Sequence, residues 1–308
     1  RETERIGQIF VLTGKSQEPT DELASGDIGA VAKLSSTLSG DTLCIRENQI
    51  TLPSPEYPTP VFQMSVFPKS KADVDKLSSA IARISEEDPS LFVTRQPDTL
   101  ELLLGGLGDT HVEVAGEKAQ RKFGVEILLH TPKVPYKETI SKGSRVEYRH
   151  KKQSGGHGQF AHVFLELEPM GRGTGFEFEQ KVVGGNVPRE YIPSVQKGVE
   201  KAMVAGTLAG FPIVDFKAVL YDGSFHPVDS SGVSFEIAGS HALSKGVEAA
   251  SPILLEPIMR AAVVVPDTDT GDVMGDLNSK RARILGMTPN GDGTTTVDVE
   301  VPQAEMLR

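Results

Sequence analysis

Between residues 60 and 130 the sequence switches repeatedly between the two-residue period of strands and the longer period of helices, and this pattern constrains the fold strongly. Strands are predicted for PVFQMSVFP, LFVTR, TLELLLGG and VEILLH. Helices are predicted for residues 70–88 and for GDTHVEVAGEKAQRKFG, which ends at Gly124. The resulting order, β-α-β-β-α-β, predicts a ferredoxin-like sandwich.

The segments on either side of this block predict further small domains. Before residue 55, the runs IGQIFVL and DIGAVAKL predict part of a β-barrel, and the proline-rich LPSPEYPTP predicts an extended linker. After Pro135 the pattern predicts strands, a helix over 188–205, the strand IVDFKAVLY and a helix that ends near Ala250. From Leu254 it predicts a strand, a helix over DVMGDLNSKRARIL and a hairpin that turns at PNGDG. The 308 residues therefore predict an α+β protein of several domains.

The chain is acidic overall, with 42 Asp and Glu residues against 32 Lys and Arg residues. This balance argues against a nucleic-acid partner for the chain as a whole, although a local cluster of cations can override it. One such cluster spans residues 142–152, where Glu147 is the one carboxylate, and a second lies near the C-terminus. Either cluster is also compatible with an ordinary solvated surface.

Cysteine usage and hydropathy narrow the class of protein. A single cysteine, Cys44, excludes an internal disulfide framework and fits a reducing cytoplasm. No apolar run approaches the roughly 18 residues that a membrane helix needs. We therefore expect a cytoplasmic protein without a membrane partner.

Two short patterns resemble phosphate and metal motifs. TGKS resembles the end of a phosphate-binding loop, but Ile9 stands where the first glycine of that loop belongs, so a turn is predicted instead. His150, His157 and His162 are potential metal ligands, but their spacing fits no common zinc pattern. Neither pattern predicts a cofactor or a metal.

The stretch GSFHPVDSSG suggests a hydrolase, because His226 and Asp229 stand beside Ser230 and Ser231. No glycine-flanked nucleophile elbow surrounds these serines, and triad residues rarely lie so close in sequence. Capping of the next helix by Asp229 or Ser230 is the simpler interpretation, and it leaves His226 unexplained. A stand-alone hydrolase stays as an alternative.

The stretch HKKQSGGHGQFAH combines features of an RNA-contacting loop. Its glycines let backbone approach a partner closely, its glutamines offer donors and acceptors, and its lysines supply charge. From spacing alone, a flexible hairpin fits equally well. The candidate contact residues are Lys151, Lys152, Gln153, Ser154, Gly155, Gly156, His157, Gly158 and Gln159.

Longer motifs resemble one family. QSGGHGQFAHV, GGNVPREYIPSVQKGVEKAM, GSFHPVDSS, PILLEPIM and TGDVMGDLNSKRARILGM closely resemble, in this order, the C-terminal half of elongation factor G, the bacterial translocase. Upstream, SGDTLC, PVFQMSVFPKSKAD and PYKETI are similar to the same family. The motifs are long and collinear, and the resemblance covers essentially the whole chain.

The resemblance implies a division into four parts. Residues 1–58 correspond to the end of the β-barrel domain II, and residues 59–133 to the ferredoxin-like domain III. Residues 134–254 correspond to domain IV, whose fold is like domain 2 of ribosomal protein S5, and residues 255–308 to an incomplete, ferredoxin-like domain V. In the family a GTPase domain precedes these parts. We therefore expect no GTP hydrolysis by this segment itself, and GTP with Mg²⁺ in the full-length parent.

The resemblance also implies a site and partners. In the family, the tip of domain IV enters the decoding site as tRNA and mRNA move. The matching tip loops are Gln153–Gln159 and Gly223–Asp229, with His226 at the apex of the second. The implied partner of this monomeric factor is the ribosome, through ribosomal RNA, ribosomal proteins and the codon–anticodon duplex. A candidate rRNA-facing basic helix contains Lys280, Arg281 and Arg283.

The sequence departs from the family pattern within the first loop. His157 stands where arginine is usual, and Phe160 and Ala161 replace tyrosine and glycine. Histidine is only partly charged at neutral pH, so we expect a weaker phosphate contact at alkaline pH. These departures favour a paralogue, for example one that acts in ribosome recycling. A tetracycline-type ribosomal protection factor fits less well because its tip loops lack QSGG, and a structural RNA-binding scaffold without a GTPase is a further alternative.

Overall fold

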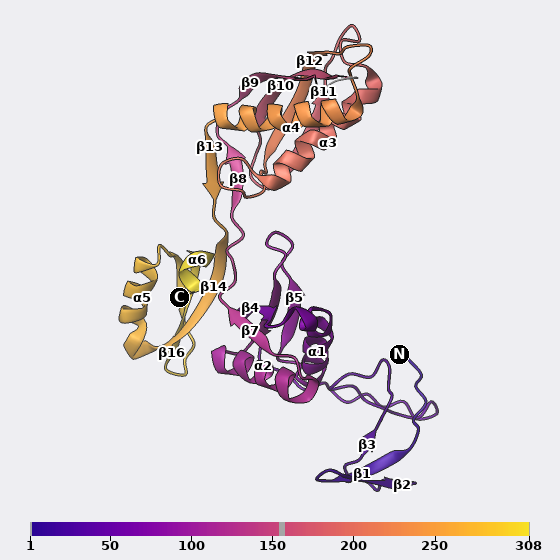
Figure 1. Cartoon of the computed structure of the whole chain (residues 1–308). Helices are drawn as coiled ribbons and strands as arrows, with labels where there is room; N and C mark the ends of the chain where they lie inside the picture. Colours follow the sequence, from indigo (N-terminus) through magenta and orange to yellow (C-terminus); the bar gives the residue numbers. More distant parts are fainter. Residues whose placement is uncertain (1, 154–157, 308) are drawn as a thin grey trace. The chain divides into compact units, whose positions relative to one another are not determined.

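The computed structural model describes residues 2–153 and 158–307, which form two compact units, Arg1–Pro132 and Lys133–Arg308 (Figure 1). We call them unit 1 and unit 2. Both combine helices with small sheets, so the predicted α+β class with several domains is confirmed. Within the described ranges, no helix has both the length and the apolar run that crossing a membrane takes.

Unit 1 begins with a small antiparallel sheet in the order β2-β1-β3. Thr13 pairs with Ser16, so Gly14 and Lys15 form the turn of a two-residue hairpin, and Gly14 adopts a positive φ of 60°. The prediction that TGKS is a turn is therefore confirmed. The three strands are β1 Ile9–Thr13, β2 Ser16–Thr20 and β3 Ala30–Val31.

The second part of unit 1 has the predicted element order β-α-β-β-α-β. Its antiparallel sheet has the order β5-β6-β4-β7, and α1 and α2 share one apolar core with it. Ser70 caps the first turn by accepting a hydrogen bond from the amide of Ala72, and Gly124 ends α2 with a φ of 67°. The elements are β4 Phe62–Pro68, η1 Lys71–Asp73, α1 Val74–Glu87, β5 Phe92–Arg95, β6 Leu102–Gly106, α2 Asp109–Phe123 and β7 Ile127–His130.

Unit 2 is built around a four-stranded sheet in the order β11-β12-β10-β9. β11 and β12 are parallel and are joined through α3, whereas the other pairs are antiparallel. The elements are β8 Lys137–Ile140, β9 Ser144–Lys152, β10 Gln159–Pro169, β11 Phe176–Gln180, η2 Arg189–Tyr191, α3 Ile192–Ala205, β12 Phe216–Ser224, α4 Gly232–Ala249 and β13 Pro252–Leu255.

Glycines allow α3 and α4 to pack closely. A Cβ on Gly198 would lie 2.0 Å from the carbonyl oxygen of Glu236, and one on Gly239 would lie 2.5 Å from that of Val195. Only glycine fits at both positions, so the two helices form one layer. Apolar side chains of this layer, including Val195 and Phe235, are fully buried against the sheet.

A buried carboxylate stabilises the end of the same domain where β8 meets the loop that follows α3, and we call this end the base. Glu138 of β8 is fully buried, and its two oxygens accept hydrogen bonds of 2.7 to 3.1 Å from four backbone amides. Burial would raise the pKa of Glu138, but these hydrogen bonds outweigh it and hold the pKa below its ordinary value. The strand β8 is thereby tied to the loop that follows α3. The donors are the amides of Thr207, Leu208, Ala209 and Phe211.

The C-terminal part of unit 2 is a three-stranded sheet in the order β14-β16-β15, packed against α5. The predicted hairpin forms, with Gly291 and Gly293 at positive φ between its strands. The elements are β14 Ile258–Pro266, η3 Asp267–Asp269, α5 Thr270–Ser279, β15 Arg283–Pro289, β16 Thr294–Pro302 and α6 Gln303–Met306.

The prediction that Lys280, Arg281 and Arg283 lie on one helix is wrong, whereas their contact with rRNA stays a prediction. The helix ends at Ser279, because Arg281 adopts a positive φ of 58°, and Arg283 already belongs to β15. The guanidinium of Arg281 donates to Glu256 and Glu305, which raise its pKa.

Candidate nucleic-acid interface

Two loops that are distant in the sequence meet at one end of the four-stranded sheet of unit 2. The first joins β9 to β10, and the second, residues 225–231, joins β12 to α4. Gly223 and Ser224 are still part of β12, so the second loop is shorter than predicted at its start. We call the described residues of the two loops, together with the adjoining ends of β9 and β10, the tip; it comprises residues 151–153, 158–160 and 225–231.

Asp229 and Ser230 join the two loops. The backbone amide of Phe160 donates to the carbonyl oxygen of Asp229 at 2.8 Å, and the amide of Gly158 donates to the Asp229 carboxylate at 3.0 Å. The hydroxyl of Ser230 donates to the carbonyl oxygen of Phe160 at 2.8 Å. The tip is therefore one hydrogen-bonded surface rather than two independent loops.

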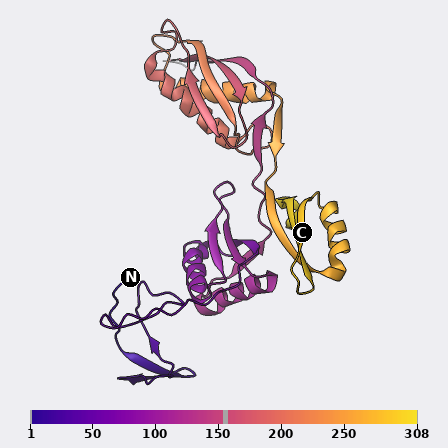
Figure 2. The same ribbon diagram turned by 180° about the vertical axis from the view of Figure 1, so that it is seen from behind.

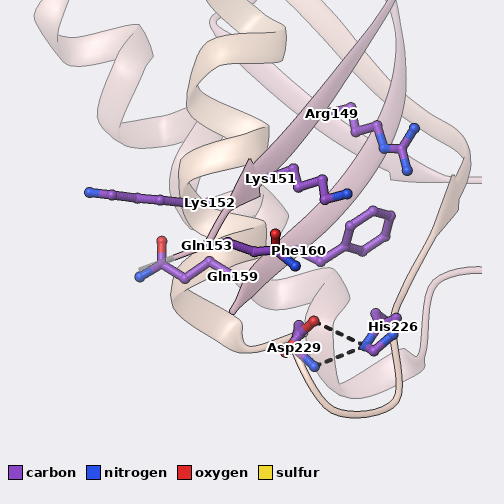
Figure 3. Close-up of a pocket in the computed structure, with 8 residues that line it drawn as sticks. All are labelled: Arg149, Lys151, Lys152, Gln153, Gln159, Phe160, His226 and Asp229. Atoms are coloured by element: carbon purple, nitrogen blue, oxygen red, sulfur yellow. Dashed lines mark hydrogen bonds and ion pairs between the residues drawn. The ribbon is translucent and has the colours of Figure 1, made fainter. Parts of the chain in front are cut away.

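The structure gives His226 a role that the sequence left unexplained. Its Nδ1 accepts hydrogen bonds from the amides of Val228 at 3.3 Å and Asp229 at 3.2 Å, and these contacts close the second loop. The same nitrogen lies 3.4 Å from a carboxylate oxygen of Asp229, and Figure 3 shows both contacts with Asp229. Acceptance from the two amides corresponds to the neutral tautomer with its proton on Nε2, whereas a protonated ring would form an ion pair with the Asp229 carboxylate. The side chain is 50% exposed, so a histidine N–H donor is presented at the surface.

The β-register places the candidate side chains on two faces. Lys151 pairs with Phe160, and Lys152 pairs with Gln159, so these pairs point to opposite sides of the hairpin. Figure 3 shows Lys152 and Gln159 directed away from Phe160. Gln159 is also engaged, because its Oε1 lies 2.9 Å from Nε2 of His150. Neighbours in the sequence thus contribute to different faces of the tip.

The tip is positively charged and slightly hollowed. A shallow hollow of about 170 Å³ is lined by three permanent cations and one carboxylate, together with polar and aromatic side chains (Figure 3). The N-terminus of α4 follows the second loop directly and adds the partial positive charge of its dipole. Phosphate oxygens would meet favourable charge here. The lining residues are Arg149, Lys151, Lys152, Gln153, Gln159, Phe160, His226 and Asp229.

Arg149 and Phe160 are the lining residues that the sequence prediction did not select. The guanidinium carbon of Arg149 lies 5.2 Å from the ring centroid of Phe160, a cation–π contact that holds the arginine over the hairpin. The signal was available, because Arg149 and Lys151 are two residues apart and share a face of a strand. Of the predicted site residues, Ser154, Gly155, Gly156 and His157 lie outside the described residues.

The contacts of the two serines do not assemble a triad. Ser230 donates to the carbonyl of Phe160 and accepts from the backbone amide of His226, and no contact joins its hydroxyl to the imidazole among the described residues. Ser231 caps α4 by accepting from the amide of Ser234, so the prediction that Asp229 or Ser230 is the cap is wrong. Both hydroxyls have structural partners.

The described histidines near the tip have partners of their own. His150 contacts Gln159, and Nε2 of His162 lies 3.2 Å from the carboxylate of Glu147. These contacts bind the two histidines to neighbouring strands.

Comparison with protein families matches three consecutive stretches of the chain. Residues 57–131 match elongation factor G domain III, residues 132–251 match elongation factor G domain IV, and residues 253–308 match the elongation factor G C-terminus. The tip lies within the domain IV match. Together these matches define a translation-related multidomain protein.

Individual relatives agree with the family matches. An elongation factor G-like protein of Thermotoga maritima is 46% identical over 305 residues, which are 99% of this chain and 45% of that protein. A crystal structure of a protein from Thermus thermophilus superposes with a TM-score of 0.77 at 39% identity, over 98% of this chain and 45% of that one. The chain thus spans about half the length of these relatives. It belongs to the elongation factor G family, as its sequence motifs predicted.

Proposed function

We propose that this chain is the effector segment of an elongation factor G-like GTPase, which binds the ribosome in the cytoplasm. Its tip would enter the decoding site and hold the codon–anticodon duplex while tRNA and mRNA move. The observation that carries this proposal is the joining of two loops by Asp229 and Ser230 into one basic surface. GTP and Mg²⁺ would act in a GTPase domain of the full-length factor, outside this segment.

The chemistry of the tip suits a grip that does not depend on base sequence. Backbone amides, glutamine amides and a histidine N–H can contact ribose hydroxyls and base edges in the minor groove of an RNA duplex, and cations can contact phosphates. No covalent step is required. A rigidly joined pair of loops would hold the duplex better than two mobile ones, because less conformational entropy is lost on binding.

At the level of domains we propose the division that the resemblance implies. Residues 1–58 would be the end of the β-barrel domain II and 59–133 a ferredoxin-like domain III. Residues 134–254 would be domain IV with the fold of ribosomal protein S5 domain 2, and 255–308 part of domain V. The element orders β-α-β-β-α-β and β-α-β-β support the two ferredoxin-like assignments.

Substitution of His226 tests this function in a full-length factor that carries the segment. His226→Ala removes the acceptor of two loop amides and the exposed N–H donor. We expect slower translocation with nearly unchanged GTP hydrolysis, measured by fluorescent mRNA movement and by phosphate release on ribosomes.

A matched control is His130→Ala, because His130 lies on β7 in unit 1, outside the tip. It should leave translocation unchanged. Loss of GTP hydrolysis in His226→Ala with normal translocation per GTP would contradict the assignment of the tip.

A second candidate function is ribosome recycling by a paralogue of the translocase. Two departures at the start of β10 motivate it, since Phe160 and Ala161 stand where the family usually has tyrosine and glycine; Phe160 contacts Arg149, and Ala161 is fully buried. Tip variants would then slow the splitting of ribosomal subunits and leave translocation unaffected, which the same ribosome preparations can measure by light scattering.

A further inference from the structure

One face of the four-stranded sheet in unit 2 carries both α3 and α4, and the other carries no helix among the residues that the structure describes. Buried apolar side chains of β9, β10 and β12 pack with these helices, and alternation sends the side chains between them, including the buried Val219, to the opposite face. In Figure 1 α4 crosses in front of the strands, and in Figure 2, from behind, the strands lie in front of α4. This second surface we call the helix-free face.

Aromatic rings form a row on the helix-free face. The ring centroids of His162 and Phe164 are 4.5 Å apart, and those of Phe164 and Tyr221 are 5.9 Å apart. Tyr221 is the extra residue of a β-bulge, which places its ring beside Phe164. The ring planes are inclined by 45° and 56°, and all three residues are partly exposed. We call these three rings the ring platform.

Cations flank the ring platform along the edge strand β9. The guanidinium of Arg145 lies 5.8 Å from the ring centroid of Tyr221, and that of Arg149 lies 5.2 Å from that of Phe160. The side chain of Arg145 is 70% exposed, so most of its N–H donors face solvent. Lys151 continues the row toward the tip. Arginine beside partly exposed rings is a combination that binds unpaired bases and phosphates.

Two carboxylates near the ring platform contact basic side chains, whereas Asp222, which pairs with Phe164, accepts from the amide groups of Asn186 and Gly223 and keeps its negative charge. Glu166 accepts from Nε of Arg145 at 2.9 Å, and Glu147 contacts His162 at 3.2 Å. At the far edge, Glu179 of β11 pairs with Lys217 at 2.5 Å. The excess positive charge therefore lies on the β9 side, and a bound polyanion would follow β9 and β10 rather than β11.

We propose that the ring platform and the cations of β9 form a second RNA site, which binds a few nucleotides of single-stranded RNA. Unpaired bases would stack on Phe164 and Tyr221, and phosphates would contact Arg145 and Arg149. A duplex does not fit this chemistry because its bases are already stacked and paired. This site goes beyond the proposed function, which concerns the tip and a duplex.

The test measures binding of this chain to a fluorescein-labelled oligouridylate by anisotropy at low and moderate salt. The variant that combines Phe164→Leu with Tyr221→Leu keeps apolar volume but removes both rings. We expect its affinity to fall about tenfold or more, because base–aromatic stacking is lost. Tyr221→Phe keeps the ring and should bind like the unmodified chain.

Two controls separate this site from other surfaces. Tyr57→Leu removes a 42% exposed tyrosine from unit 1 and should leave the affinity unchanged. Lys152→Ala removes a tip cation that points away from the helix-free face and should weaken binding much less than loss of the rings. Melting curves by circular dichroism show whether each variant is folded.

Crosslinking of the unmodified chain tests the same site without relying on variants that could misfold. An oligonucleotide that contains 4-thiouridine should crosslink to peptides from β10 or β12 of the unmodified chain. Crosslinks confined to the two loops, an affinity for single-stranded RNA that the double leucine variant leaves unchanged, or no saturable binding would each overturn the proposal. His226 is not part of the ring platform, so these outcomes leave the translocation test of the tip independent.

Discussion

Two carboxylates of unit 2, Glu138 and Asp229, bind backbone amides in very different surroundings. Glu138 is fully buried and accepts four amides, whereas Asp229 has a side chain that is 27% exposed and accepts the amide of Gly158. The first lies at the base of the domain, and the second at the tip. The same kind of bond therefore stabilises the fold at one end and shapes an exposed surface at the other.

The difference follows from solvent. When a buried acceptor is removed, the amides that donated to it are left without hydrogen bonds, because water cannot reach them to replace the lost contacts. At an exposed tip, water can replace a lost partner, so the free energy of unfolding changes less. We therefore expect substitutions at the base to change global stability and substitutions at the tip to change local order.

The largest effect is expected for Glu138→Gln. The new side-chain NH₂ would replace a carboxylate oxygen that accepts from two backbone amides, for example those of Thr207 and Leu208. At least two N–H groups would then have no acceptor. The free energy of unfolding of unit 2 should fall by about 3 kcal/mol, measured by urea denaturation.

The matched control is Glu236→Gln, which removes a carboxylate that pairs with Lys197 and Lys201 on the surface. It should change stability by less than about 1 kcal/mol. Equal effects of the two substitutions would show that the buried amides tolerate an uncharged partner.

An intermediate effect is expected from acid. The pKa of Glu138 is lowered in the folded state from its ordinary 4.5, so its stabilising contribution is complete above pH 4.5. Below that pH the unfolded chain takes up the proton first, and the contribution is lost as pH falls through the folded pKa. Urea denaturation across this acidic range should show a steeper loss of stability for the unmodified chain than for Glu138→Gln, and parallel curves would contradict the lowered pKa.

The smallest effect on global stability is expected for Ser230→Ala. The hydroxyl joins the two loops by accepting from the amide of His226 and donating to the carbonyl of Phe160. Its loss should lower stability by about 1 kcal/mol and speed hydrogen exchange at the amide of His226. Exchange measured by NMR or mass spectrometry tests this.

Ser244→Ala serves as the comparison, because that hydroxyl bonds only within α4, to the carbonyl oxygen of Ser240 at 3.3 Å. Exchange at the tip should be unchanged in it. If Ser230→Ala also left exchange at the tip unchanged, the two loops would not depend on this joint.

Local sequence signals predicted the elements well where a residue acts on its own neighbours. Gly124 ends α2 through its positive φ, and the apolar stripe of α1 is buried at Leu77, Ile81 and Ile84, although Val74 is exposed. The helix predicted for the C-terminal basic cluster was wrong because residues distant in the sequence act on that cluster. Its residues have a high local helix propensity, yet α5 already ends at Ser279. Arg281 instead contacts Glu256 and Glu305, which are more than twenty positions away in the sequence.

The sequence by itself therefore determined the order of strands and helices and the family motifs, because periodicity and capping act over a few residues. Only the tertiary structure decided which surfaces these residues form. It joined Gly158 to Asp229 across 71 positions, separated Lys151 from Lys152 by strand register, and placed Tyr221 beside Phe164 through a bulge. Such contacts depend on how strands pair and helices pack, and the local pattern of residues does not specify them.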